Sequence, residues 1–245
     1  SMFSEVDQII AVCQWVKDVL TCNGVDPQKI TLCRQGITDQ RQTIALNQAQ
    51  HGSSLNIAFL GRLDPTKGVH ILIQALRSLL SDPFRLVIYG VVHGEPGQRY
   101  ERELRRLAAG DERIEFHSPI RTAEVVSTLR DFDLVAVPSQ WLETGPLVVL
   151  EAFSAGVPVI GSRLGSIAET VRDGVDGILV PATSVEAWAQ ALLRLNRDRG
   201  LVELLRRGVK PPRSMPVVAN EMAALYAQVH EDNVEYRFST AAKSR

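Results

Sequence analysis

The sequence predicts an α/β fold with a parallel, doubly wound sheet. Two observations predict it: short apolar runs recur from Leu55 onward, and amphipathic helical patterns fill the gaps between them. Neighbouring parallel strands need a crossover connection, and the hand of that crossover is fixed. Repeated strand–helix alternation therefore indicates one Rossmann-like domain.

Each element of this domain follows from its own pattern. The expected strands are apolar runs at 56–60, 85–89, 113–117, 134–137, 157–160 and 178–180. The expected helices are amphipathic stretches at 69–80, 98–109, 122–130, 146–155, 166–172 and 185–194.

Both flanks of this domain carry further elements. Residues 8–12, 15–20 and 29–32 suggest a strand–helix–strand piece, and the polar stretch 39–54 suggests a linker. Two more helices are expected at 201–207 and 217–230, followed by a polar, frayed tail at 232–245. We therefore predict three parts: an N-terminal domain remnant with its hinge at 1–54, the Rossmann-like domain at 55–212, and a C-terminal crossing helix with its tail at 213–245.

Composition excludes some classes of protein. A net charge of −1 with 22% charged residues argues against a nucleic-acid binder, which needs a strongly basic face. Three cysteines at wide spacing suggest neither a disulfide framework nor a zinc site. We expect a cytoplasmic protein without a transmembrane segment or signal peptide. Ser1-Met2 ahead of a domain-like start suggests a fragment of a longer chain.

Two unusual loops follow the first and fourth expected strands. One is Gly61-Arg62-Leu63-Asp64-Pro65-Thr66-Lys67-Gly68, and the other is Pro138-Ser139-Gln140-Trp141-Leu142-Glu143-Thr144-Gly145-Pro146. In a sheet of order 3-2-1-4-5-6, ligands bind beyond the carboxyl ends of strands 1 and 4, where the winding reverses. Both loops should therefore border the ligand site.

The first loop is suited to a diphosphate. Arg62 and Lys67 are fixed cations at the start of a helix, where free amides and the helix dipole also favour an anion. The alternative is that Arg62 pairs with Asp64 and Lys67 faces water.

The second loop opens a helix with Pro146, which suits the first helical position and leaves the amides of Gly145, Leu147 and Val148 free. Glu151 follows on a helix that is apolar almost all round, so its carboxylate needs hydrogen-bond donors. A ribose diol would supply two such donors. A structural salt bridge to an arginine is the equal alternative.

Other motifs favour no second chemistry. Asp131-Phe132-Asp133 has the D-x-D spacing of some metal sites but precedes strand 4, at the wrong edge of the sheet. The histidines lack metal-ligand spacing, no hydrolase nucleophile motif is present, and the glycines after the second strand do not form G-x-G-x-x-G. We expect no metal and no nicotinamide cofactor.

These loops resemble those of the retaining GT-B glycosyltransferases of family 4, the glycosyl transferases group 1. Gly61-Arg62-Leu63 with Lys67-Gly68 is similar to that family's G-R-L-x-x-x-K-G loop, and Glu143 with Glu151 reproduces its E-x7-E motif. Ala152-Phe153-Ser154-Ala155-Gly156-Val157-Pro158 and Gly165-Ser166-Ile167-Ala168-Glu169 continue the pattern.

The resemblance implies a role for each matching residue. Arg62 and Lys67 would hold the donor diphosphate and stabilise the leaving group, without a metal. Glu143 would bind the donor sugar's hydroxyls, and these three residues would form the catalytic set. Glu151 would bind the ribose.

The resemblance also assigns the rest of the donor site. Gly145 and Leu147, with the neighbouring amide of Val148, would face the sugar or phosphate. The base would lie beside Tyr89 and the segment containing Pro119 and Ile120. Ser118, and Thr144-Gly145 in place of Phe-Gly, depart from the common pattern and leave the sugar preference open.

The resemblance implies a two-domain enzyme whose N-terminal Rossmann-like domain, with the acceptor pocket, is absent here. We expect a nucleoside diphosphate sugar as co-substrate, no other cofactor, and no transfer by this part alone. A non-catalytic nucleotide-binding module and a sugar-nucleotide 2-epimerase-like domain remain alternatives. The donor base, the acceptor, and peripheral membrane attachment of the full-length form stay open.

Overall fold

The computed structural model describes residue 3, residues 5–38 and residues 54–243, with side chains described up to residue 232. The chain divides into two compact units, Ser1–Asp39 with Arg213–Arg245, and Gln40–Pro212. Of the predicted linker at 39–54, all but Ser54 lies outside the described residues.

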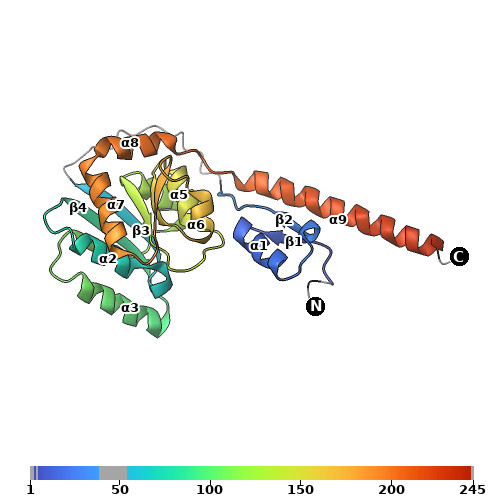
Figure 1. Ribbon diagram of the computed structural model, residues 1–245, viewed down its shortest axis with the longest axis horizontal. Coiled ribbons are helices and arrows are strands. Elements are labelled where there is room, and N and C mark those ends of the chain that lie inside the picture. The colour runs from blue at the N-terminus through green and yellow to red at the C-terminus, as the bar shows by residue number, and fades with distance from the viewer. Residues whose placement is uncertain (1–2, 4, 39–53, 244–245) are drawn as a thin grey trace. The chain divides into compact units, whose positions relative to one another are not determined.

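The larger unit contains a parallel sheet of six strands in the order β5-β4-β3-β6-β7-β8. Figure 1 labels β3 and β4 of this sheet. The strands are β3 (Leu55–Arg62), β4 (Phe84–Val91), β5 (Ile114–His117), β6 (Leu134–Val137), β7 (Val159–Ser162) and β8 (Gly177–Val180). The predicted fold class and strand order are therefore confirmed. The winding direction reverses between β3 and β6, which pair through Ile57 with Leu134 and Ala58 with Val135.

Helices cover both faces of this sheet. They are η3 (Pro65–Lys67), α2 (Val69–Arg77), α3 (Gly94–Leu107), η4 (Thr122–Glu124), α4 (Val125–Leu129), α5 (Leu147–Ser154), α6 (Gly165–Thr170), α7 (Val185–Arg197) and α8 (Arg199–Gly208). Strand residues alternate between two hydrophobic cores, so that Ile57 faces one and Ala58 the other. The first core packs against α2, α3, α7 and α8, and the second against α4, α5 and α6.

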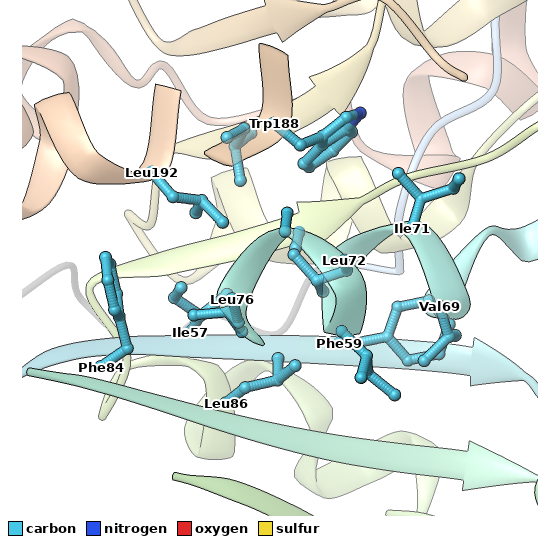
Figure 2. Packing of buried hydrophobic residues seen from close by; sticks show 14 of the residues in the cluster. Ile57, Phe59, Val69, Ile71, Leu72, Leu76, Phe84, Leu86, Trp188 and Leu192 are labelled. Carbon is cyan, nitrogen blue, oxygen red and sulfur yellow. The ribbon is translucent and has the colours of Figure 1, made fainter. Parts of the chain in front are cut away.

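The first core is the larger. Trp188 of α7 and Leu72 and Leu76 of α2 are fully buried against Ile57 of β3 and Leu86 of β4 (Figure 2). Full burial of one leucine or isoleucine side chain contributes about 1.5–3 kcal/mol to the free energy of folding. The packing fixes α2 on the sheet, and with it the loop that joins β3 to α2.

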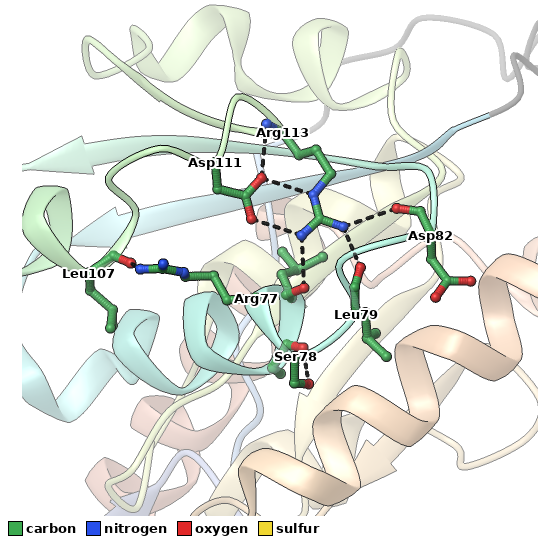
Figure 3. A network of polar contacts seen from close by, with 9 residues as sticks. Arg77, Ser78, Leu79, Asp82, Leu107, Asp111 and Arg113 are labelled. Carbon is green, nitrogen blue, oxygen red and sulfur yellow. Dashed lines mark hydrogen bonds and ion pairs between the residues drawn. The ribbon is translucent and has the colours of Figure 1, made fainter.

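A polar network closes the opposite end of α2 (Figure 3). The Arg113 guanidinium donates to the carbonyls of Leu76 at 3.0 Å and Asp82 at 3.0 Å, and it pairs with the Asp111 carboxylate at 2.8 Å. The last carbonyls of a helix have no intrahelical donor, so Arg113 supplies one. This anchors the amino-terminal edge of the sheet, away from the predicted ligand side.

The smaller unit contains β1 (Ile9–Ala11), α1 (Gln14–Cys22), η2 (Pro27–Lys29), β2 (Ile30–Leu32) and α9 (Met215–Lys243). β1 and β2 pair in parallel, as Ile9 opposite Ile30 shows. The predicted strand–helix–strand piece is therefore present.

Two predicted boundaries were wrong by four residues or more. Helix α3 begins at Gly94, before the predicted residue 98, because Pro96 lies in the first turn, where a missing N–H breaks no intrahelical bond. Helix α9 continues to Lys243, so the stretch predicted to fray from 232 is helical almost throughout. No glycine or proline follows Pro216 to end it. Among the described residues, no helix combines the length and apolar character needed to span a bilayer.

Candidate functional site

A cavity of about 380 Å³ lies at the carboxyl ends of β3 and β6, where the sheet reverses its winding. It is lined by Phe59, Leu60, Gly61, Arg62, Lys67, Tyr89, Val91, Pro119, Ile120, Val125, Val137, Pro138, Ser139, Glu143, Gly145, Pro146, Leu147, Val148 and Glu151. All ten residues predicted to form the site line this one cavity. Ser139 was not among the predicted site residues, because no sequence pattern indicates the partner of its hydroxyl.

The two loops that border the cavity are bound to each other. The amide of Gln140 donates to the Thr66 carbonyl at 2.7 Å, and the Gln140 side chain donates to the carbonyls of Pro138 and Ala182 at 2.7 Å each. Gly68 has a φ of +72°, and a Cβ placed there would lie 1.8 Å from the Pro138 carbonyl oxygen. Only glycine permits this approach of the loops.

Arg62 ends β3 with an exposed side chain that lines the cavity. The alternative pairing with Asp64 does not form, because the Asp64 carboxylate instead accepts from the amide of Thr66 at 2.9 Å and from its hydroxyl at 2.5 Å. These bonds lower the pKa of Asp64, with a smaller contribution from the charge of Arg62. Within the described part of the chain the Arg62 guanidinium makes no hydrogen bond, so its five donors are available to a ligand.

Lys67 does not simply face water. Its ammonium donates to Glu143 Oε1 at 2.6 Å, and the two side chains are only 25% and 18% exposed. The same carboxylate oxygen accepts from the Ser139 hydroxyl at 2.6 Å. An ammonium has three donors, so pairing with Glu143 leaves Lys67 able to bind an anion in the cavity as well.

Of the two helices that begin beside the cavity, α5 contributes its first residues, Leu147 and Val148, to the lining, whereas α2 does not. Helix α5 begins at Leu147, with Pro146 as its N-cap and not its first residue, so the amides of Leu147 and Val148 have no intrahelical acceptor. The expected contribution of α2 was wrong. Gly68 and Val69 are buried and do not line the cavity, and the His70 amide donates to the Tyr100 hydroxyl at 3.3 Å.

Glu151 lies on the cavity side of α5, and burial raises the pKa of its carboxyl. No arginine or lysine among the described residues forms a salt bridge with it, which excludes that alternative within this part of the chain. The carboxylate instead faces the cavity, where its lost hydration is not compensated by protein donors.

An apolar wall of the cavity is formed by Tyr89, Val91, Pro119, Ile120 and Val125. Tyr89 at the end of β4 contacts the ring of Phe132 edge-on at 6.2 Å between centroids, and burial raises the pKa of its phenol. Its ring is therefore held by packing and presents a flat, uncharged surface.

Asp133 lies at the other edge of the sheet. Its carboxylate accepts from the amide of Asn56, near the start of β3, at 2.8 Å and from Arg199 at 3.0 Å. The expected position of the D-x-D segment is confirmed. Over the described residues, no group of three or more acidic, histidine or cysteine side chains is arranged to hold a metal ion.

The six-stranded, doubly wound parallel sheet of this chain, with its charged cavity at the switch point, has the architecture of the C-terminal half of a GT-B fold. The chain belongs to the glycosyl transferases group 1 family, whose model matches residues 42–210.

Relatives agree with this family. The D-inositol 3-phosphate glycosyltransferase of Corynebacterium glutamicum is 34% identical over 238 residues, covering 90% of this chain and 57% of the relative. The D-inositol 3-phosphate glycosyltransferase of Streptomyces bingchenggensis is 31% identical over 219 residues, covering 82% of this chain and 48% of the relative. The chain thus spans about half the length of these relatives.

Among solved structures, Anabaena HepE in complex with UDP superposes with a TM-score of 0.78 at 21% identity, over 91% of this chain and 64% of that one. The C-terminal domain of LpcC, a group 1 glycosyl transferase from Francisella tularensis, gives a TM-score of 0.55 at 26% identity, over 63% and 81%. The first likeness concerns the fold alone.

Proposed function

We propose that this chain is the donor-binding domain of a retaining, metal-independent glycosyltransferase, and that its cavity binds a nucleoside diphosphate sugar. The observation that carries the proposal is the convergence of Arg62, Lys67, Glu143 and Glu151 in one cavity at the switch point. Two cations, two carboxylates and an apolar wall match the diphosphate, the hydroxyls and the base of such a donor. UDP bound to HepE, a protein of the same fold, supports the same ligand class.

In the proposed reaction the bond between the sugar's anomeric carbon and the phosphate oxygen breaks, and its electron pair stays on the leaving diphosphate. An acceptor hydroxyl forms the new bond to the anomeric carbon, and its proton passes to the leaving diphosphate. Arg62 and Lys67 both line the cavity before the reaction, so their charges lie close to this developing anion and stabilise it. These two cations and the free amides of α5 would also replace the usual divalent metal. Retention of the anomeric configuration follows from the family resemblance.

The remaining contacts divide among the other cavity residues. Glu143 would accept from the sugar's hydroxyls, and Glu151 would accept from the ribose diol that compensates its lost hydration. Tyr89, Pro119 and Ile120 would enclose the base. We infer that transfer also needs a second domain with the acceptor pocket, and that this chain alone binds the donor without transferring its sugar.

Calorimetric titration of UDP, GDP and ADP, each with and without Mg²⁺, tests the proposal. We expect one nucleotide to bind, with an affinity that Mg²⁺ changes by less than about threefold, because Arg62 and Lys67 neutralise the diphosphate. Binding that requires Mg²⁺ would contradict the metal-independent site. The same titration with a chain that includes the second domain shows whether that domain adds affinity, and an assay of transfer by that longer chain separates an enzyme from a nucleotide-binding module.

Replacing Glu151 by glutamine should raise the stability of the ligand-free chain at neutral pH. Because burial raises the pKa of Glu151, its contribution to stability is present below pH 4.5 and is lost as pH rises through the folded pKa. The Glu151→Gln variant should therefore have a higher Tm than the wild type at pH 7, as thermal denaturation would show. A structural salt bridge would give a lower Tm.

The same residue should make binding depend on pH. As pH falls from 7 through the raised pKa of Glu151, the carboxylate gains a proton and loses its capacity to accept from two hydroxyls. Nucleotide affinity should then decrease more in the wild type than in Glu151→Gln. The variant lacks the titrating carboxyl, so its pH dependence shows the effect of protonating the nucleotide itself. Equal slopes for the two proteins would mean that Glu151 does not contact the ribose.

A further inference from the structure

Ser139 and Lys67 bind the same oxygen of Glu143. Ser139 follows β6 by two residues, is 1% exposed, and donates its hydroxyl to Glu143 Oε1 at 2.6 Å. The Lys67 ammonium donates to that oxygen from the opposite loop, also at 2.6 Å. One carboxylate oxygen thus receives a neutral donor from the β6 loop and a charged donor from the β3 loop.

Glu143 needs such support because it lies in the loop between β6 and α5, outside any helix or strand. Its backbone is held there, since the Glu143 carbonyl accepts from the amide of Ser166 at 2.9 Å. The side chain has three further rotatable bonds, and a glutamate side chain loses much conformational entropy when it is fixed. Side-chain donors therefore decide where its carboxylate stands.

The two donors differ in what a ligand does to them. A diphosphate in the cavity would attract Lys67 strongly, because charge-assisted bonds to phosphate are about twice as strong as neutral ones. Without the Ser139 hydroxyl, the Glu143 carboxylate would shift as Lys67 turns toward the diphosphate. The Ser139 hydroxyl is neutral and buried, so a diphosphate leaves its bond to Glu143 in place.

We propose that Ser139 is a positioning residue that keeps the Glu143 carboxylate oriented toward the donor sugar while Lys67 binds the diphosphate. This inference rests on the proposed function. The buried hydroxyl of Ser139 would then help the site to bind a sugar nucleotide more tightly than the bare nucleoside diphosphate.

The test compares two affinities for each protein. Calorimetry with UDP and UDP-glucose, GDP and GDP-mannose, and ADP and ADP-glucose gives, for the pair that binds, the ratio by which the sugar improves binding. We expect Ser139→Ala to reduce this ratio by about tenfold, the size of one hydrogen bond to a charged group, and to change the affinity for the bare diphosphate much less. Ser139→Thr, which keeps a hydroxyl, should restore the ratio. Ser139→Val, which has the shape of threonine without the hydroxyl, should not.

A double-mutant cycle separates positioning from packing. If Ser139 acts through Glu143, Ser139→Ala should have no further effect on the ratio in a Glu143→Ala background. Additive effects, equal losses for the diphosphate and the sugar nucleotide, or a wild type that binds both members of every pair equally would each overturn the inference. Binding of no nucleotide at all would instead overturn the proposed function, and the inference with it.

Discussion

Replacing Gly68 by alanine should strongly lower the free energy of unfolding. We expect a larger loss than for any other substitution that adds one methyl group to the two loops at the cavity. The left-handed backbone costs an L-residue about 1–2 kcal/mol. A Cβ at 1.8 Å from the Pro138 carbonyl oxygen forces the loops apart, which adds about 1–3 kcal/mol or more. Urea denaturation of Gly68→Ala against the wild type measures the sum.

Gly110→Ala is the matched control for this variant. Gly110 has a φ of +79°, close to that of Gly68, but a Cβ there meets nothing within 4 Å. Its substitution therefore reports the backbone cost alone, and the difference between the two variants isolates the contact between the loops. Equal destabilisation by the two substitutions would show that the loops do not approach as closely as described.

Replacing Arg62 by alanine should weaken binding of the nucleoside diphosphate by about 10- to 100-fold, because a hydrogen bond to a charged group contributes about 1.5–3 kcal/mol. Arg62→Lys should recover only part of the loss, since a lysine offers a point charge where the guanidinium offers a planar fork. Isothermal titration calorimetry of the wild type, Arg62→Lys and Arg62→Ala should show affinities that decrease in that order.

Arg99→Ala controls for the loss of one positive charge. Arg99 is exposed on α3 and pairs with Glu95 at 3.9 Å, outside the cavity. Its replacement should leave nucleotide affinity within about twofold of the wild type, because solvent and salt screen a distant surface charge. A similar loss in Arg99→Ala and Arg62→Ala would mean that net charge, and not the cavity, governs binding.

The sequence predicted the sheet and the place of the site because both depend on local patterns. Alternating apolar runs and amphipathic helices determine a doubly wound sheet, and the winding rule then locates the switch point without knowledge of any contact. Arg62 and Glu151 could be selected because they are charged residues in that place. The strand order and the shared cavity agree with these predictions.

The contacts across the site could not be predicted, because they join residues that are distant in sequence. Nothing in the first loop indicates that Lys67 pairs with Glu143, or that the Tyr100 hydroxyl occupies an amide of α2. Ser139 appears in the sequence as an ordinary loop serine, and only the fold brings its hydroxyl to Glu143.

The proposed function depends most on the diphosphate binding between the two loops, and a crystal structure of the chain with the nucleoside diphosphate that binds tests it most directly. We expect both phosphates within hydrogen-bond distance of Arg62 and Lys67, with the ribose at Glu151 and the base beside Tyr89. A nucleotide bound outside this cavity, or bound there with its phosphates away from both cations, would contradict it.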